Sequence, residues 1–192
     1  MGNFAKQMKR KQLQKTNKGA ARGIRQANRA DKQVMTAYER QNVTDMLTEI
    51  KTAQDLTVIF FVAAHRIFGF SGKRLKRLVE KMGSHIECIR QGYVTVRDIE
   101  KILEEEAHMV IDHKDIKKVS RTRSIKWRVQ GEMTAAFLIS LLDGWGYKKI
   151  RLERVYEEVA RIADGLATKE FTMEDLKELL TGEAHYTNEA VA

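Results

Sequence analysis

The 192-residue sequence contains no proline and only one cysteine, Cys88. A single cysteine excludes an internal disulfide framework and a zinc site of the usual multi-cysteine spacing, and it fits a reducing environment. Proline breaks helices and makes up about 5% of an average protein. A chain of this length without proline is therefore expected to be mostly helical.

Long apolar runs are also missing. The longest, residues 56–64, is nine residues even when Thr57 is counted with it, which is about half of what a bilayer requires. The Met-Gly start resembles a myristoylation signal, but Lys6 stands where that signal has Ser or Thr. We therefore expect no membrane contact and a location in the cytoplasm, which would be the host cytoplasm for a phage-encoded protein.

Positive charge is concentrated at the N-terminus. Residues 1–32 hold ten cations and one acid, so this segment carries the whole formal net charge of +9. Seven of its cations alternate at spacings of four and three residues and would form one stripe about 30 Å long on a helix. Phosphates that bound such a stripe would neutralise its charge and favour the helix. Gly19, Gly23 and the repulsion between aligned cations disfavour a helix and instead suit a solvated arm. The arm is thus expected to be disordered, or helical on binding.

The remaining sequence contains an internal repeat. A shift of 77 residues aligns 56–103 with 133–180 without a gap, and ten of the 48 aligned positions are identical. Other aligned pairs, such as Phe70 with Tyr147, keep their apolar character. The pattern predicts a tandem duplication of a three-helix unit.

Each unit is expected to begin with an apolar helix, followed by an amphipathic one. We place these helices at 53–68 and 73–90 in the first copy, and at 131–145 and 149–165 in the second. The third helix begins after Thr95 or Thr172, because threonine is a good N-cap and an acid follows it three residues later.

The segment between the units, 108–130, is basic and less regular. Residues 124–129 alternate apolar and polar side chains with the period of a half-buried strand, so a short basic hairpin and an irregular linker are both compatible with the sequence. The predicted all-α chain then consists of a basic arm (1–32), an amphipathic helix and the first repeat (33–107), the basic linker or hairpin (108–130), the second repeat (131–182) and a frayed tail (183–192).

An arginine pair lies near the start of the second helix of each repeat. Arg74 with Arg77, and Arg151 with Arg154, lie three residues apart on the polar side, where they could bind a phosphate or pair with acids such as Glu80. The first copy is favoured for anion binding because residues 66–101 hold nine cations and four acids, whereas 143–183 hold seven and ten. The aromatic residues beside the arginines are expected to wedge the turns into the core rather than to stack on bases.

The repeated turn also carries a resemblance. The sequence Phe68-Gly-Phe-Ser-Gly-Lys-Arg-Leu-Lys-Arg77 resembles a motif of small helical accessory proteins from phages and prophages of Gram-positive bacteria, a family without an established function. The second copy departs from this motif with Lys149-Ile150 in place of Gly-Lys. The resemblance implies a phage or prophage accessory protein and no particular activity.

No nucleophile, carboxylate pair or metal-ligand set stands out, so we expect no enzyme, cofactor or metal site. The leading hypothesis is a regulatory protein that binds DNA or RNA through phosphates with low sequence specificity. The alternative is an inhibitor of a host protein or ribonucleoprotein, of the anti-CRISPR or anti-defence type. The candidate nucleic-acid-binding residues are Lys9, Arg10, Lys11, Lys15, Lys18, Arg22, Arg25, Arg29, Lys32, Lys73, Arg74, Arg77, Arg121, Arg123, Lys126 and Arg128.

Overall fold

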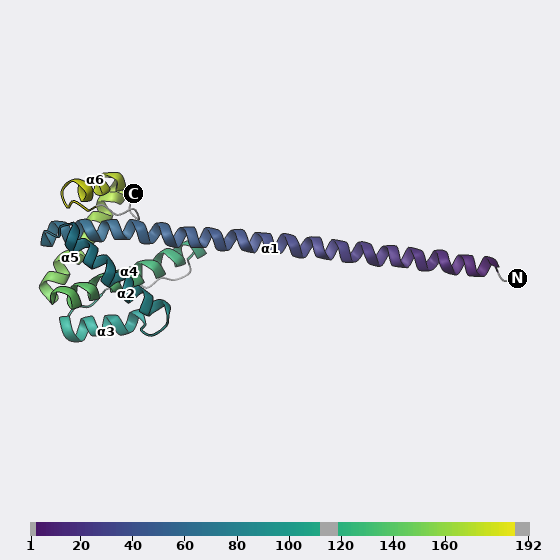
Figure 1. The fold of residues 1–192 in the computed structure, drawn as a ribbon, viewed down its shortest axis with the longest axis horizontal. Coiled ribbons are helices and arrows are strands. Elements are labelled where there is room, and N and C mark those ends of the chain that lie inside the picture. Colours follow the sequence, from purple (N-terminus) through teal and green to yellow (C-terminus); the bar gives the residue numbers. More distant parts are fainter. Residues whose placement is uncertain (1–2, 112–118, 187–192) are drawn as a thin grey trace. The chain divides into compact units, whose positions relative to one another are not determined.

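The computed structural model describes the backbone of residues 3–111 and 119–186, and side chains from residue 36 onward within those ranges. Every regular element in the described ranges is a helix (Figure 1), which confirms the predicted all-α class. The chain divides into two compact units, residues 1–46 and 47–192, and the contacts given below lie within the second. The helices are α1 (Asn3–Phe68), α2 (Gly72–Arg90), α3 (Val96–Ala107), α4 (Arg121–Trp145), α5 (Lys149–Thr168) and α6 (Met173–Gly182).

Helix α1 is longer than the sequence analysis predicted. Separate helices were expected over 33–52 and 53–68, but α1 continues through both ranges. No glycine or proline lies between residues 24 and 68, so nothing interrupts the backbone hydrogen bonds until Gly69, which adopts a positive φ of 63°. The side chains of the predicted basic arm, 1–32, lie outside the described residues.

The core is built around α1 and α4. Residues 58–64 of α1 and 133–142 of α4 are buried throughout, as expected for helices that are apolar on most sides. Phe60 and Phe137 stack with their ring centroids 4.5 Å apart and their planes 4° from parallel. Helices α2 and α3 both pack on α4, and α2 buries Leu75, Leu78 and Met82 at helical spacing. None of the helices in the described ranges is long and apolar enough to cross a membrane.

A buried carboxylate links α1 to α5. Glu158 is only 5% exposed and lies 3.2 Å from the Arg66 guanidinium of α1. Arg161, one turn further along α5, donates from Nε to the second carboxylate oxygen at 2.9 Å. A buried charge is tolerated only when it is paired, so Arg66 and Arg161 have a structural role.

The helix ends repeat with the offset seen in the sequence. Helices α1 and α4 end at Phe68 and Trp145, α2 and α5 begin at Gly72 and Lys149, and α3 and α6 begin at Val96 and Met173. The residues after the first break, Gly69 and Gly146, have φ values of 63° and 64°. Each of these pairs is separated by 77 residues in the chain.

Identical capping boxes begin α3 and α6, as predicted. The Thr95 hydroxyl accepts a hydrogen bond from the Asp98 backbone N–H at 3.2 Å, and the Asp98 carboxylate accepts one from the Thr95 backbone N–H at 2.8 Å. The equivalent distances at Thr172 and Asp175 are 3.3 Å and 2.7 Å. Hydrogen bonds from the threonine side chain and backbone lower the pKa of Asp98, and those from the threonine backbone and side chain lower the pKa of Asp175.

We predict that Thr95→Ala and Thr172→Ala each lower the free energy of unfolding by about 1 kcal/mol at neutral pH. Because both folded-state pKa values are lowered, the contribution of each carboxylate is present at neutral pH and is lost as pH falls below about 4. Urea unfolding at pH 7 and pH 3 should therefore show a smaller difference from wild type in acid. Thr122→Ala, at an exposed position of α4, is the control and should cost nothing; equal losses at both pH values would contradict the prediction.

Neither of the two alternatives for the segment between the units, a short hairpin or an irregular linker, holds for residues 121–130, which are helical. Residues 124–129 lie in α4, which begins after Ser120, where the serine hydroxyl accepts a hydrogen bond from the Arg123 backbone N–H. The alternating pattern was misleading because Ile125, Val129 and Met133 also satisfy helical spacing, and these three residues face the core. Residues 112–118 lie outside the described residues.

The expected frayed tail is wrong for its first four residues. Ala184 and Tyr186 are buried, and the Tyr186 ring packs edge-on against Phe61 at 5.2 Å. The Ala184 carbonyl accepts a hydrogen bond from the Gly72 backbone N–H at 2.7 Å, which ties this segment to the start of α2. Residues 187–192 lie outside the described part of the chain.

Candidate anion-binding surface

Four aromatic rings from the two repeated turns form one cluster. Phe68 packs on Tyr147 with 4.5 Å between ring centroids, and Phe70 packs on Trp145 at 4.8 Å. Phe70 is fully buried and Tyr147 is 9% exposed, whereas Phe68 and Trp145 are half-buried. The predicted wedge of the turns into the core is therefore confirmed, and these rings offer little free face for stacking on bases.

Arginines from the first two turns of α2 and the first turn of α5 lie over the rings of this aromatic cluster. The Arg74 guanidinium lies 5.8 Å from the centroid of the Phe70 ring, and the Arg151 guanidinium lies 4.9 Å from that of Tyr147. Arg77 reaches across to the other turn and lies 5.4 Å from the Trp145 ring. Contact with a ring face orients a guanidinium while leaving its N–H groups free to donate in the ring plane.

These arginines have no acidic partner among the described residues. Arg74, Arg77, Arg151 and Arg154 are all exposed, and none takes part in an ion pair within the described residues. Ion pairing with acids on the same helix, such as Glu80, was the sequence-based alternative to phosphate binding, and the structure does not show it. The four guanidiniums thus keep their hydrogen-bonding capacity for a ligand. We call these four residues the arginine surface.

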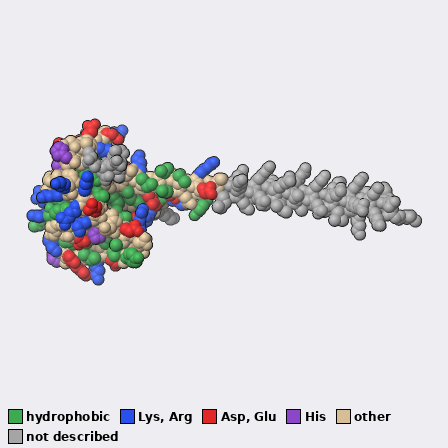
Figure 2. Space-filling view, in the orientation of Figure 1, with side chains coloured by type: hydrophobic (Ala, Val, Ile, Leu, Met, Phe, Trp, Pro, Cys, Tyr) green, Lys and Arg blue, Asp and Glu red, His purple; other side chains and the backbone are tan. Residues whose placement is uncertain are grey.

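The helix starts beneath the arginine surface are also free of negative charge. Neither α2 nor α5 has an acid in its first turn or a side-chain cap on its first amides, in contrast to α3 and α6. The positive ends of both helix dipoles therefore add to the charge of the arginines. Lys73 and Lys76 are exposed on α2, and Lys and Arg side chains gather at the left of the view in Figure 2, where α1 runs to its C-terminal end.

The structure divides the predicted nucleic-acid-binding residues into three groups. Lys9, Arg10, Lys11, Lys15, Lys18, Arg22, Arg25, Arg29 and Lys32 lie among side chains outside the described residues. Lys73, Arg74 and Arg77 meet at the start of α2. Arg121, Arg123, Lys126 and Arg128 lie in the first two turns of α4, about 25 to 35 Å along that helix from Trp145. The last two groups therefore belong to separate surfaces.

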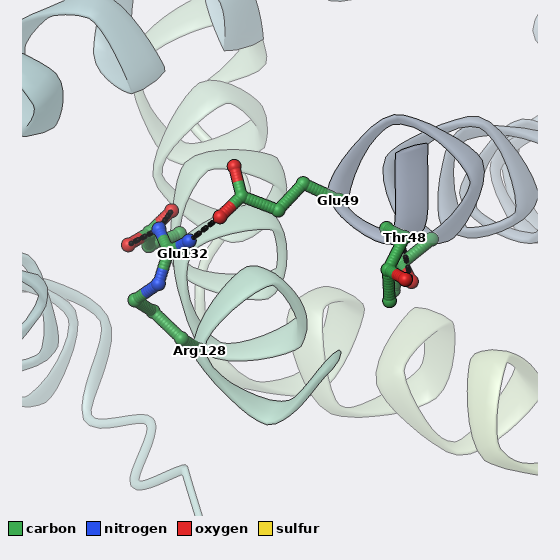
Figure 3. Close-up of polar contacts among 5 residues, drawn as sticks. Thr48, Glu49, Arg128 and Glu132 are labelled. Atoms are coloured by element: carbon green, nitrogen blue, oxygen red, sulfur yellow. Dashed lines mark hydrogen bonds and ion pairs between the residues drawn. The ribbon is translucent and has the colours of Figure 1, made fainter. Parts of the chain in front are cut away.

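The α4 group is less suited to binding phosphate than expected. Arg128 forms an ion pair with Glu49 of α1 and another with Glu132 at 3.2 Å (Figure 3). Arg123 instead lies 4.9 Å from the centroid of the Trp127 ring, on the same helix. Arg128 thus has carboxylate partners on two helices, and it joins α1 to α4 rather than standing open to a ligand.

Sequence reasoning left Arg151 and Arg154 out of the candidate set. The second repeat was set aside because of its excess of acids, but Glu158 turns into the core and Glu153 pairs with Lys149 at 3.8 Å. The 77-residue offset was the signal that could have found both arginines, since it aligns them with Arg74 and Arg77.

Comparisons with known proteins give no further guidance. No family model, no curated protein and no solved structure matches this chain. Within the described residues, no group of three or more His, Cys, Asp or Glu side chains could hold a metal ion.

Proposed function

We propose that this protein binds nucleic acid through the phosphate backbone, using the basic arm (1–32) and the arginine surface. The observation that carries the proposal is a set of four exposed guanidiniums, three of them oriented by aromatic rings and none paired with an acid in the described part of the chain. Arginine binds phosphate bidentately and stays charged at every physiological pH. Phosphate contacts position a protein without reading sequence, so we expect low sequence specificity.

The net charge supports the same proposal. The arm carries the formal net charge of +9, and a cationic segment attracts a polyanion over the range of a Debye length. The arm would supply most of the affinity, while the arginine surface would fix how the helical unit sits on the ligand. The resemblance of the repeated turn implies a phage or prophage accessory protein, and we propose that its role there is regulatory.

We further propose that residues 56–103 and 133–180 descend from one unit by tandem duplication. The equal spacing of the helix ends, the two capping boxes and the two left-handed glycines support this origin. Duplication explains why the arginine pairs occur twice at the same place on the helix, with the same relation to the aromatic turn.

A second candidate function is the inhibition of a host protein. Within the second unit, Leu47 and Ile50 of α1 are exposed and lie three residues apart on one helix face, and an exposed apolar face typically packs on a partner protein. An anti-defence inhibitor would use this face, and its partner would remain bound after nucleic acid is removed.

An affinity pull-down from host cells, with and without nuclease treatment, separates the two candidates. For a nucleic-acid-binding protein, we expect nuclease to release the associated proteins together with the DNA or RNA. A stoichiometric host protein that survives the treatment would contradict the leading proposal and favour the inhibitor.

A further inference from the structure

The two repeats pack against each other with a local two-fold relationship. Phe60 stacks on Phe137, which is its own equivalent at the 77-residue offset. Phe68 contacts Tyr147, and the equivalent contact in the other direction joins Trp145 to Phe70. Reciprocal contacts of this kind define an isologous interface, in which residue i meets j and j meets i about a two-fold axis.

The arginine surface follows the same symmetry. Arg74 lies over Phe70, and its equivalent Arg151 lies over Tyr147, the equivalent ring. The Phe70 and Tyr147 centroids are 6.4 Å apart, so the two rings that carry these arginines are neighbours. Arg77 and Arg154 continue the two pairs one helical turn later, and both are exposed. The surface therefore presents one cationic pair from each repeat. Arg74 and Arg151 make equivalent ring contacts, whereas Arg77 also lies over Trp145, a contact that Arg154 does not repeat within the described residues.

We infer that the ligand of this surface is double-stranded nucleic acid, with one arginine pair on each strand. The inference rests on the proposed function and specifies its substrate class. The backbones of an antiparallel duplex are related by two-fold axes perpendicular to the helix axis whatever the sequence, and proteins with two-fold symmetry use that match. A single strand has a direction and no such axis, so it cannot present equivalent phosphates to both pairs.

The buried aromatic rings point to the same ligand. Proteins that bind single strands generally stack bases on exposed aromatic side chains beside a basic groove. Here the rings beside Arg74 and Arg151 pack within the protein: Phe70 is fully buried and Tyr147 is nearly so. The surface offers guanidiniums for phosphates but little aromatic area for unstacked bases.

The test measures the affinity of the full chain for a mixed-sequence 24-base-pair DNA duplex, the matching RNA duplex, and the DNA single strand, over a series of salt concentrations. The variants are Arg74→Ala/Arg77→Ala, Arg151→Ala/Arg154→Ala and the combination of all four. Arg90→Ala/Arg97→Ala removes the same charge from the far end of α2 and the start of α3, and serves as the matched control. Thermal melting shows whether each variant remains folded. If the alanine substitutions destabilise the protein, the variant Arg74→Lys/Arg77→Lys is used in their place, because it keeps the positive charge.

Each arginine-pair variant should weaken duplex binding by a similar factor, roughly 50-fold at 0.1 M salt. The reason is that a pair makes two phosphate contacts, and each contact contributes about 0.9 to the slope of log affinity against log salt. The fourfold variant should lower the ratio of duplex to single-strand affinity, and the control should leave that ratio unchanged. The relative affinity for the two duplexes identifies DNA or RNA as the preferred form.

Two results would overturn the inference in distinguishable ways. If the fourfold variant loses the same factor on the duplex and on the single strand, or only one pair matters, the surface binds phosphate without the two-fold match and the proposed function stands. If the arginine variants bind every probe as tightly as wild type does, the arginine surface is not a contact and its part in the proposed function fails as well.

Discussion

Replacing Phe70 with alanine should lower the free energy of unfolding by about 3 kcal/mol. The Phe70 ring is fully buried and contacts Trp145 and Phe68, so its removal leaves a cavity where the two repeats meet. For a chain of this size, that loss corresponds to a fall in melting temperature of roughly 6 to 12 °C. Differential scanning calorimetry or thermal circular dichroism measures it directly.

Tyr93→Ala is the control for Phe70→Ala, because Tyr93 is 79% exposed and its removal should leave the melting temperature nearly unchanged. A Phe70→Ala protein that melts like wild type would contradict the buried role of the ring. If that protein had also lost its affinity for nucleic acid, the ring would stack on bases, which is the interpretation that the structure disfavours.

Deleting residues 1–32 should have the largest effect on binding. If about six of the seven stripe cations meet phosphates, the arm contributes roughly −5 to the slope of log affinity against log salt on a duplex, and about −4 on a single strand. The truncated protein should therefore lose most of its affinity at 50 mM salt.

The stability of the truncated protein is the control. The deleted segment contains few apolar residues, so the melting temperature of the helical core should change little. A full-length variant with the seven stripe cations replaced by glutamine should reproduce the loss of binding without shortening α1. These seven are Lys11, Lys15, Lys18, Arg22, Arg25, Arg29 and Lys32. Equal affinities for the full and truncated chains would make the arm a solubility element and would favour the protein-inhibitor hypothesis.

The fold was predictable where local chemistry decides it. Thr95 and Thr172 identify helix starts because a side-chain cap depends on residues only three positions apart. Gly69 and Gly146 mark helix ends because their left-handed backbone suits glycine. The apolar helices were recognisable because no polar stripe interrupts them.

Elements that depend on tertiary contacts were harder to predict. The segment around Trp127 fits both a strand and a helix by its pattern, and packing of Val129 and Met133 into the core selects the helix. Of the arginine surface, only the pair in the first repeat was predicted from the sequence. The pair in the second repeat was missed because the net charge of a repeat does not show which way each acidic side chain points. Glu158 turns inward to Arg66, and Arg151 is exposed on the same helix.

The salt dependence of duplex binding by the full chain tests the central claim most directly. A mixed-sequence duplex is titrated at several salt concentrations between 50 and 200 mM, and a second duplex of unrelated sequence is titrated alongside. We predict a slope of about −5 or steeper, a loss of roughly three decades in affinity across this range, and nearly equal affinities for both sequences. Absence of binding at 50 mM salt, or an affinity that is independent of salt, would contradict a phosphate-binding function.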